Sequence, residues 1–144
     1  MRSLIRAVTV FAALMIAVLI RAPASYADDA SAKDVQAVIS AQIDAFKHDD
    51  GAKAYSYASR DVQMMFPNIE MFMSMVRNGY APVYHPRQFQ FGPFVASGDI
   101  LRQTVELTDA EGTAWTAEYT LSKQADGTVK ISGCRLSKKP GIGA

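Results

Sequence analysis

Cysteine is almost absent from this sequence, since Cys134 is the only one in 144 residues. A single cysteine cannot form an internal disulfide, so the stability of the fold must come from a packed core. Clusters of positive charge are also scarce, and Lys138 and Lys139 are the only adjacent basic residues. Because nucleic-acid binding requires clustered lysine and arginine, the composition argues against a nucleic-acid partner.

The N-terminal residues have the pattern of a secretory signal peptide. Arg2 and Arg6 precede an uncharged apolar run over residues 7–20, and small residues surround Tyr26 at the end. This pattern predicts cleavage after Ala27 and a periplasmic or secreted protein. The alternative is an uncleaved membrane anchor, although the run is short for a membrane-spanning helix.

Removal of residues 1–27 changes the formal net charge from +1 to −2, because this segment carries three arginines and no acidic residue. The remaining chain has the length of one domain. We expect that domain over residues 28–137 and a flexible C-terminal tail over residues 138–144. After cleavage no basic amphipathic helix remains, so we expect no membrane attachment.

The first half of this domain predicts three helices, over residues 31–47, 52–58 and 68–79. Side chains that we expect to pack inward recur at helical spacing in the longest of them: Val35, Val38, Ile39, Gln42, Ile43 and Phe46. The third helix begins at Asn68, a favourable N-cap, and has a second apolar stripe: Ile69, Phe72, Met73 and Val76.

From Tyr84 onward the sequence alternates between apolar and polar residues, which predicts strands over residues 84–95, 99–109, 113–124 and 128–137. Three loops that end in glycine separate them: residues 96–98, 110–112 and 125–127. Each fits a three-residue hairpin loop with its glycine in the left-handed conformation.

These loops fix the expected register between neighbouring strands. They pair Leu107 with Trp115, Val105 with Ala117, Leu101 with Leu121, Leu121 with Ile131, and Phe89 with Val105. Polar residues then fall on the opposite face. We therefore expect an α+β domain in which three N-terminal helices pack on one face of a curved, four-stranded antiparallel meander.

Four segments carry a resemblance to a known family: residues 42–46 (QIDAF), 54–58 (AYSYA), 75–80 (MVRNGY) and 129–134 (VKISGC). On these residues the chain resembles a family of exported bacterial proteins known as domain of unknown function 4864. The resemblance implies the nuclear transport factor 2-like, cystatin-like cone. It supplies no function, because this fold hosts enzymes and binding proteins alike.

The expected register places two rows of side chains on the inner face of the sheet. One row is Phe91, Gln103, Tyr119 and Gly133, and the other is Phe89, Val105, Ala117 and Arg135. The small residues leave room for a pocket, in which Gln103 and Tyr119 would form hydrogen bonds and Arg135 would bind an anion. The alternatives stay open: Gln103 bonds buried backbone, Tyr119 is ordinary core, or a β-bulge at Gly133 turns Arg135 outward and Cys134 and Leu136 inward.

The favoured function is therefore non-catalytic binding of a small, partly apolar ligand, which is anionic if Arg135 points inward, with Gln103, Tyr119, Arg135, Phe91 and Trp115 as ligand-binding candidates. An isomerase, dehydratase or hydrolase is the alternative, with His85 as a weak catalytic candidate, because the strand carboxylates Glu106 and Glu118 fall on the wet face. A protein-interaction module, with Trp115 in a homodimer interface, is a third hypothesis.

Methionines crowd the segment between residues 64 and 75, and thioether sulfur binds Cu(I). Helical spacing splits them, since Met71 and Met75 share a face and Met73 belongs to the core stripe. Methionine is also a common filler of cores and adaptable surfaces. We therefore expect neither a metal nor another cofactor.

Overall fold

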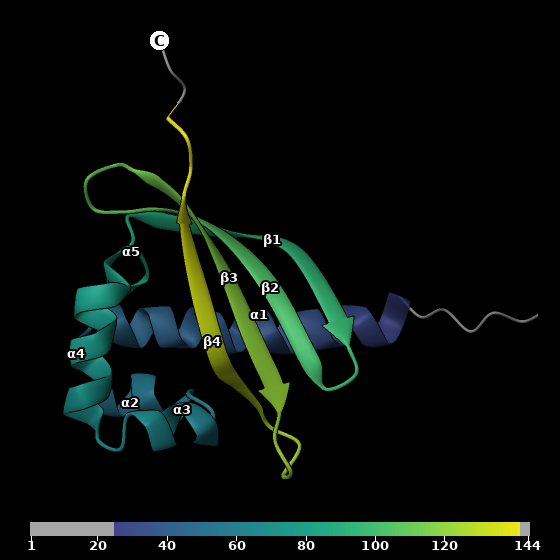
Figure 1. Ribbon diagram of the computed structural model, residues 1–144. Coiled ribbons are helices and arrows are strands. Elements are labelled where there is room, and N and C mark those ends of the chain that lie inside the picture. The colour runs from purple at the N-terminus through teal and green to yellow at the C-terminus, as the bar shows by residue number, and fades with distance from the viewer. Residues whose placement is uncertain (1–24, 142–144) are drawn as a thin grey trace, which may run out of the picture.

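The computed structural model describes residues 25–141 of the chain, with side chains from residue 31 onward. The helices are α1 (Ser25–Lys47), α2 (Gly51–Ser56), α3 (Arg60–Met65), α4 (Ile69–Gly79) and α5 (Ala81–Tyr84). The strands are β1 (Gln88–Ser97), β2 (Ile100–Thr108), β3 (Ala114–Lys123) and β4 (Val129–Lys138). They form one antiparallel sheet in the order β1-β2-β3-β4 (Figure 1). The predicted α+β meander is confirmed.

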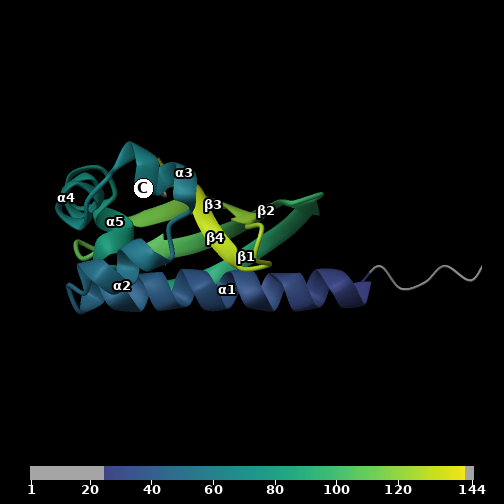
Figure 2. The ribbon, with the colours of Figure 1, turned by 90° about the horizontal axis from the view of Figure 1, so that it is seen from below.

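Helix α1 lies along one face of the sheet, and the shorter helices gather at its C-terminal end (Figure 2). The predicted stripe of α1 is buried, with Val35, Ile39 and Ile43 packed in one core with strand residues such as Val105 and Leu121. A second core joins the helices to one another and contains Phe46, Ala54, Phe72, Met73 and Val76. The fold thus has a helix–sheet core and a separate helix–helix core.

Two short helices were not expected from the sequence. Helix α3 begins after Ser59, whose side chain accepts a hydrogen bond from the Val62 amide, as an N-cap does. Helix α5 has Pro82 in its first turn, where proline is tolerated because the first amides of a helix have no intrahelical partner. As a consequence β1 begins at Gln88, later than the predicted Tyr84.

Two of the three predicted hairpin loops are confirmed. In the β2–β3 loop the Gly112 amide bonds the Asp109 carbonyl, and in the β3–β4 loop the Gly127 amide bonds the Gln124 carbonyl. Both glycines have positive φ. All predicted pairs between β2 and β3, and the pair Leu121–Ile131, are present.

The first hairpin differs from the prediction. Ser97 pairs with Ile100, so the loop has two residues, and Gly98 at φ 59° takes the positive-φ position. An irregularity between Phe91 and Phe94 then shifts the register again, where Pro93 has no amide to donate. Phe89 therefore pairs with Leu107, and Phe91 rather than Phe89 pairs with Val105.

Strand β4 contains a β-bulge, which was one of the alternatives that the sequence allowed. Thr120 pairs with Gly133 and Leu121 pairs with Ile131, so Ser132 is the extra residue. The Ser132 hydroxyl donates a hydrogen bond to the Thr120 carbonyl at 3.1 Å. Beyond the bulge, Cys134 pairs with Tyr119 and Leu136 pairs with Ala117, so both follow the inward-facing residues of β3.

The segment between α2 and α3 joins the helical half to the sheet. Ala58 forms an isolated parallel bridge with Ile131. The Ser59 amide donates to the Ile131 carbonyl, and the Ile131 amide donates to the Tyr57 carbonyl, both at 2.8 Å. None of the helices described between residues 25 and 141 is long and apolar enough to cross a membrane.

Candidate functional site

A cavity of about 240 Å³ lies between the helical half of the domain and strands β3 and β4. Apolar side chains from α1, α3 and α4 form most of its wall, including Phe46, Val62, Phe72 and Val76. The polar side chains on the wall are few: Gln42, Tyr80, Tyr119, Ser132 and Cys134. Since none of the lining residues carries a carboxylate, ammonium, guanidinium or imidazole group, the cavity is uncharged.

The bulge of β4 shapes one side of this cavity. Ser132, Gly133 and Cys134 all line it, because the extra residue changes the direction in which the strand presents its side chains. Gly133 pairs with Thr120, whose side chain lies on the face of the sheet away from the helices, so Gly133 lines the cavity with its backbone.

Tyr119 has the most unusual environment of the lining residues. Tyr119 is 1% exposed, and its hydroxyl forms no hydrogen bond of normal geometry within the described residues, although the Cys134 thiol lies beside it. Burial raises the pKa of this phenol well above its ordinary value, and the neighbouring Cys134 thiol raises it further. An unsatisfied buried polar group costs about 1–3 kcal/mol, so a further hydrogen bond to this hydroxyl would be favourable.

Cys134 faces Tyr119 across the two strands. Burial raises the pKa of its thiol to about 12, although its interaction with Tyr119 acts in the opposite direction. The thiol is therefore protonated at neutral pH, and a protonated thiol is a poor nucleophile and metal ligand. The polar groups of the cavity can donate or accept hydrogen bonds, but none is poised to exchange a proton near pH 7.

Gln103 is buried as predicted, but it does not line the cavity. Its Nε2 donates to the carbonyls of Gly92, at 2.9 Å, and Thr104, at 2.8 Å. Its Oε1 accepts a hydrogen bond from Gln36 of α1 at 3.1 Å. The expected pocket role is thus corrected, because the carboxamide is occupied by the backbone at the irregularity of β1.

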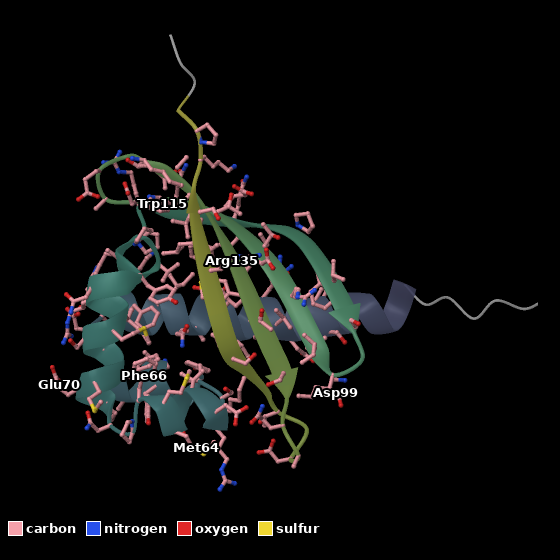
Figure 3. All side chains as sticks on the ribbon, viewed as in Figure 1. Met64, Phe66, Glu70, Asp99, Trp115 and Arg135 are labelled. Carbon is pink, nitrogen blue, oxygen red and sulfur yellow. The ribbon has the colours of Figure 1, made fainter. Side chains whose placement is uncertain are left out.

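Arg135 lies on the opposite face of the sheet from the helices, so its expected inward position is also corrected. The bulge puts it opposite Glu118, and its side chain is 75% exposed. One guanidinium nitrogen lies 3.1 Å from the Glu118 carboxylate. The anion-binding group that the sequence suggested is therefore outside the cavity (Figure 3).

The two aromatic candidates also lie outside the cavity. Phe91 packs in the helix–sheet core and stands edge-on to Phe89, with ring centres 5.8 Å apart. Trp115 lies near the end of the sheet beside the β2–β3 loop, and its indole nitrogen donates to the Asp109 carboxylate at 2.8 Å. Tyr119 is the one predicted ligand-binding residue that lines the cavity.

His85, the weak catalytic candidate, is exposed and does not line the cavity. Its Nε2 lies 3.8 Å from the Asp49 carboxylate, which also accepts a hydrogen bond from the Tyr84 hydroxyl. Among the described residues, no three His, Cys, Asp or Glu side chains are grouped so that they could hold a metal ion.

Sequence reasoning missed the residues that close the cavity on the helical side, among them Met65, Phe66 and Met75. Their place depends on how α3 and α4 pack against β4, and no local pattern encodes that packing. Two features of the sequence pointed toward this region: the methionines crowded between residues 64 and 75, and Gly133, which marked the β-bulge.

Two solved structures are similar to this fold. An NTF-2-like protein of unknown function from Silicibacter pomeroyi DSS-3 has 13% identity and a TM-score of 0.55, over 77% of this chain and 98% of that chain. An NTF-2-like protein of unknown function from Shewanella baltica OS155 has 15% identity and a TM-score of 0.54, over 78% and 97%. The domain thus has the NTF-2-like fold, as the resemblance implied.

The family whose profile matches is described as "Domain of unknown function (DUF4864)", and the match covers residues 28–144. The chain belongs to this family. No curated protein matches it.

Proposed function

We propose that this domain binds a small, neutral and largely apolar molecule in the cavity between α3, α4 and β4, without transforming it. The single observation that carries the proposal is the apolar cavity of about 240 Å³ beside Tyr119, a buried residue whose hydroxyl forms no hydrogen bond of normal geometry among the described residues. Apolar pockets with a few convergent polar groups are typical binding sites for small molecules.

The chemistry of the wall restricts the ligand. Apolar side chains surround it, and a charged ligand would lose its hydration without meeting an opposite charge. We therefore replace the anionic ligand suggested by the sequence with a neutral one. A group such as a ketone or hydroxyl would fit best, because it can form one hydrogen bond with Tyr119 and leave the rest of the molecule in apolar contact.

Binding without catalysis is favoured because the groups on the wall are neutral at physiological pH. The Cys134 thiol, with its pKa near 12, supplies neither a base nor a nucleophile there. The N-terminal sequence supports export as part of the same proposal, so the ligand would be met in the periplasm or outside the cell.

Two isosteric probes test the proposal: acetophenone, whose carbonyl accepts a hydrogen bond, and α-methylstyrene, in which a methylene group replaces that oxygen. We expect acetophenone to bind more tightly to the wild-type protein. Tyr119→Phe should weaken acetophenone binding about fivefold, the value of one net hydrogen bond, and leave α-methylstyrene unchanged. Affinities are measured by NMR titration, and residues around the cavity should show the shifts.

Tyr57→Phe is the matched control, because Tyr57 is partly buried and does not line the cavity. Tyr119→Phe should also keep or slightly raise the free energy of unfolding, since it removes an unpaired hydroxyl. The proposal fails if neither probe shifts cavity residues, or if Tyr119→Phe weakens both probes equally.

A further inference from the structure

The cavity opens to the surface at the end of α3. Met65 lines the cavity and is nevertheless 65% exposed, so it marks the opening. Phe66 and Met75 also line the cavity, and both are only partly buried. Figure 3 shows Phe66 between α4 and β4. The mouth is therefore bounded by flexible apolar side chains rather than by polar ones.

A second, more open hollow continues outward from this mouth along α4. We call it the α4 groove; it is formed by Phe66, Glu70, Met71, Ser74, Met75 and Asn78. Phe66 and Met75 belong to both the cavity and the groove, so the two hollows adjoin at these side chains. Glu70, Ser74 and Asn78 follow one another at intervals of four residues along α4, and so do Met71 and Met75, so all five lie on one side of the helix.

Met71 is 48% exposed, and it belongs to a run of exposed apolar residues that is concentrated in α3 and α4. Met71 does not belong to the buried face of α4, which is formed by Phe72, Met73 and Val76. Met75 packs partly against the helix–helix core, whereas Met71 is not among the residues packed in either core. Methionine is suited to contact with a flexible apolar partner, because its side chain adapts and is polarisable.

We propose that the ligand carries one unbranched apolar chain, which leaves the cavity between Met65, Phe66 and Met75 and lies in the α4 groove against Met71. This inference rests on the proposed function and specifies its ligand class. The cavity alone, at about 240 Å³, is smaller than the range of about 300–1,000 Å³ usual for sites that enclose a drug-sized molecule. The polar head would stay at Tyr119 and the tail would end at the surface.

The path favours a thin chain over a bulky ligand or a protein segment. It runs from an open groove, past partly buried aromatic and methionine side chains, to Tyr119, a residue that is 1% exposed. A flexible chain of methylene groups can follow this change of direction. The ion pair between Glu70 and Arg77 and the hydrogen bond between Asn78 and Ser74 leave the polar edge of the groove without a free cation for an anionic head.

Methyl ketones with straight chains from propyl to nonyl test the inference on the full domain. Methyl propyl ketone is short enough to occupy the cavity alone. In the longer ketones, each additional methylene group that contacts the groove should raise the affinity up to about fourfold. Met71→Glu should lower the affinity for methyl nonyl ketone about tenfold, because a carboxylate replaces an apolar contact. The same substitution should change the affinity for methyl propyl ketone less than twofold.

Met64→Glu is the matched control, since Met64 lies on α3, is 64% exposed and lines neither the cavity nor the groove. It should leave the affinity for both ketones unchanged. The inference is overturned if the affinity stops rising once the cavity is filled, or if Met64→Glu and Met71→Glu have equal effects. Failure of the propyl ketone to bind, with no effect of Tyr119→Phe, would instead reject the proposed function itself.

Discussion

Gln103 is a buried polar side chain whose hydrogen-bonding capacity is used by the backbone. Its Nε2 satisfies the carbonyls of Gly92 and Thr104, and Gln36 supplies a donor to its Oε1. The irregularity of β1 would otherwise leave carbonyls without partners, because the strand ladder is interrupted between Phe91 and Phe94. Gln103 therefore connects α1, β1 and β2 through three hydrogen bonds.

Gln103→Leu should consequently lower the free energy of unfolding by about 2–4 kcal/mol, since it leaves more than one buried group unpaired. Urea denaturation measures this loss. Binding of acetophenone under native conditions should stay unchanged, because Gln103 does not line the cavity. Gln90→Leu serves as control, since Gln90 is exposed on β1; equal stability of the two variants would contradict the structural role.

The sequence predicted that Gln103 and Tyr119 are neighbours on the inner face, and the structure pairs them directly. The sequence could not predict which of these two side chains lies beside open space. That distinction depends on Gln36 of α1 reaching Gln103 and on the helices leaving room beside Tyr119. Both are contacts between segments that are far apart in the chain.

The β2–β3 loop is held by the carboxylate of Asp109. It accepts hydrogen bonds from the amides of Glu111 and Thr113 and from the indole of Trp115. The hydrogen bond from Trp115 is the main reason why the pKa of Asp109 lies below its ordinary 3.8, and the two amides contribute further. Arg87 also reaches this loop and donates to the Ala110 carbonyl at 2.9 Å.

A lowered carboxyl pKa stabilises the folded state at pH values above the ordinary pKa, and this contribution disappears as the pH falls through the folded pKa. Asp109→Ala should therefore lower the melting temperature at neutral pH, and its difference from the wild type should shrink below about pH 4. Thermal melts followed by Trp115 fluorescence measure both effects. Glu111→Ala, in the same loop, should show little change; a difference that does not depend on pH would contradict the role of the Asp109 charge.

The hairpins show what local patterns can and cannot fix. Two glycine-closed loops and the β2–β3 register were predicted correctly, because loop length and side-chain alternation agree there. The β1–β2 loop was assigned one residue too many. Alternation in β1 is interrupted by Gly92 and Pro93, so it could not correct that error.

The predicted order of helices followed by an antiparallel meander describes the domain well, and the two similar NTF-2-like structures agree with it. The position of the cavity could not be predicted, since it lies where α3, α4 and β4 meet and α3 itself was not expected. The expected site on the sheet surface is instead filled by α1 and its apolar stripe.

Export can be tested on the whole chain. The predicted signal peptide lies largely outside the described residues. The predicted cleavage site falls in the first turn of α1, before Val35, the first buried residue among those from residue 31 onward. Expression in a bacterial host should give an exported protein that begins at Asp28, as measured by intact mass and N-terminal sequencing. Ala27→Gln should block this processing; an exported wild-type protein that keeps its first residues would contradict the prediction.

The two hydrogen bonds between the 57–59 segment and Ile131 have a consequence for behaviour in concentrated solution. A last strand offers free amides and carbonyls to any extended chain that approaches, and this is a common route to intermolecular β-aggregation. At Ile131 those groups are already taken by Tyr57 and Ser59 of the same molecule. Detachment of this segment would uncover them, so local opening there should precede the formation of insoluble polymers.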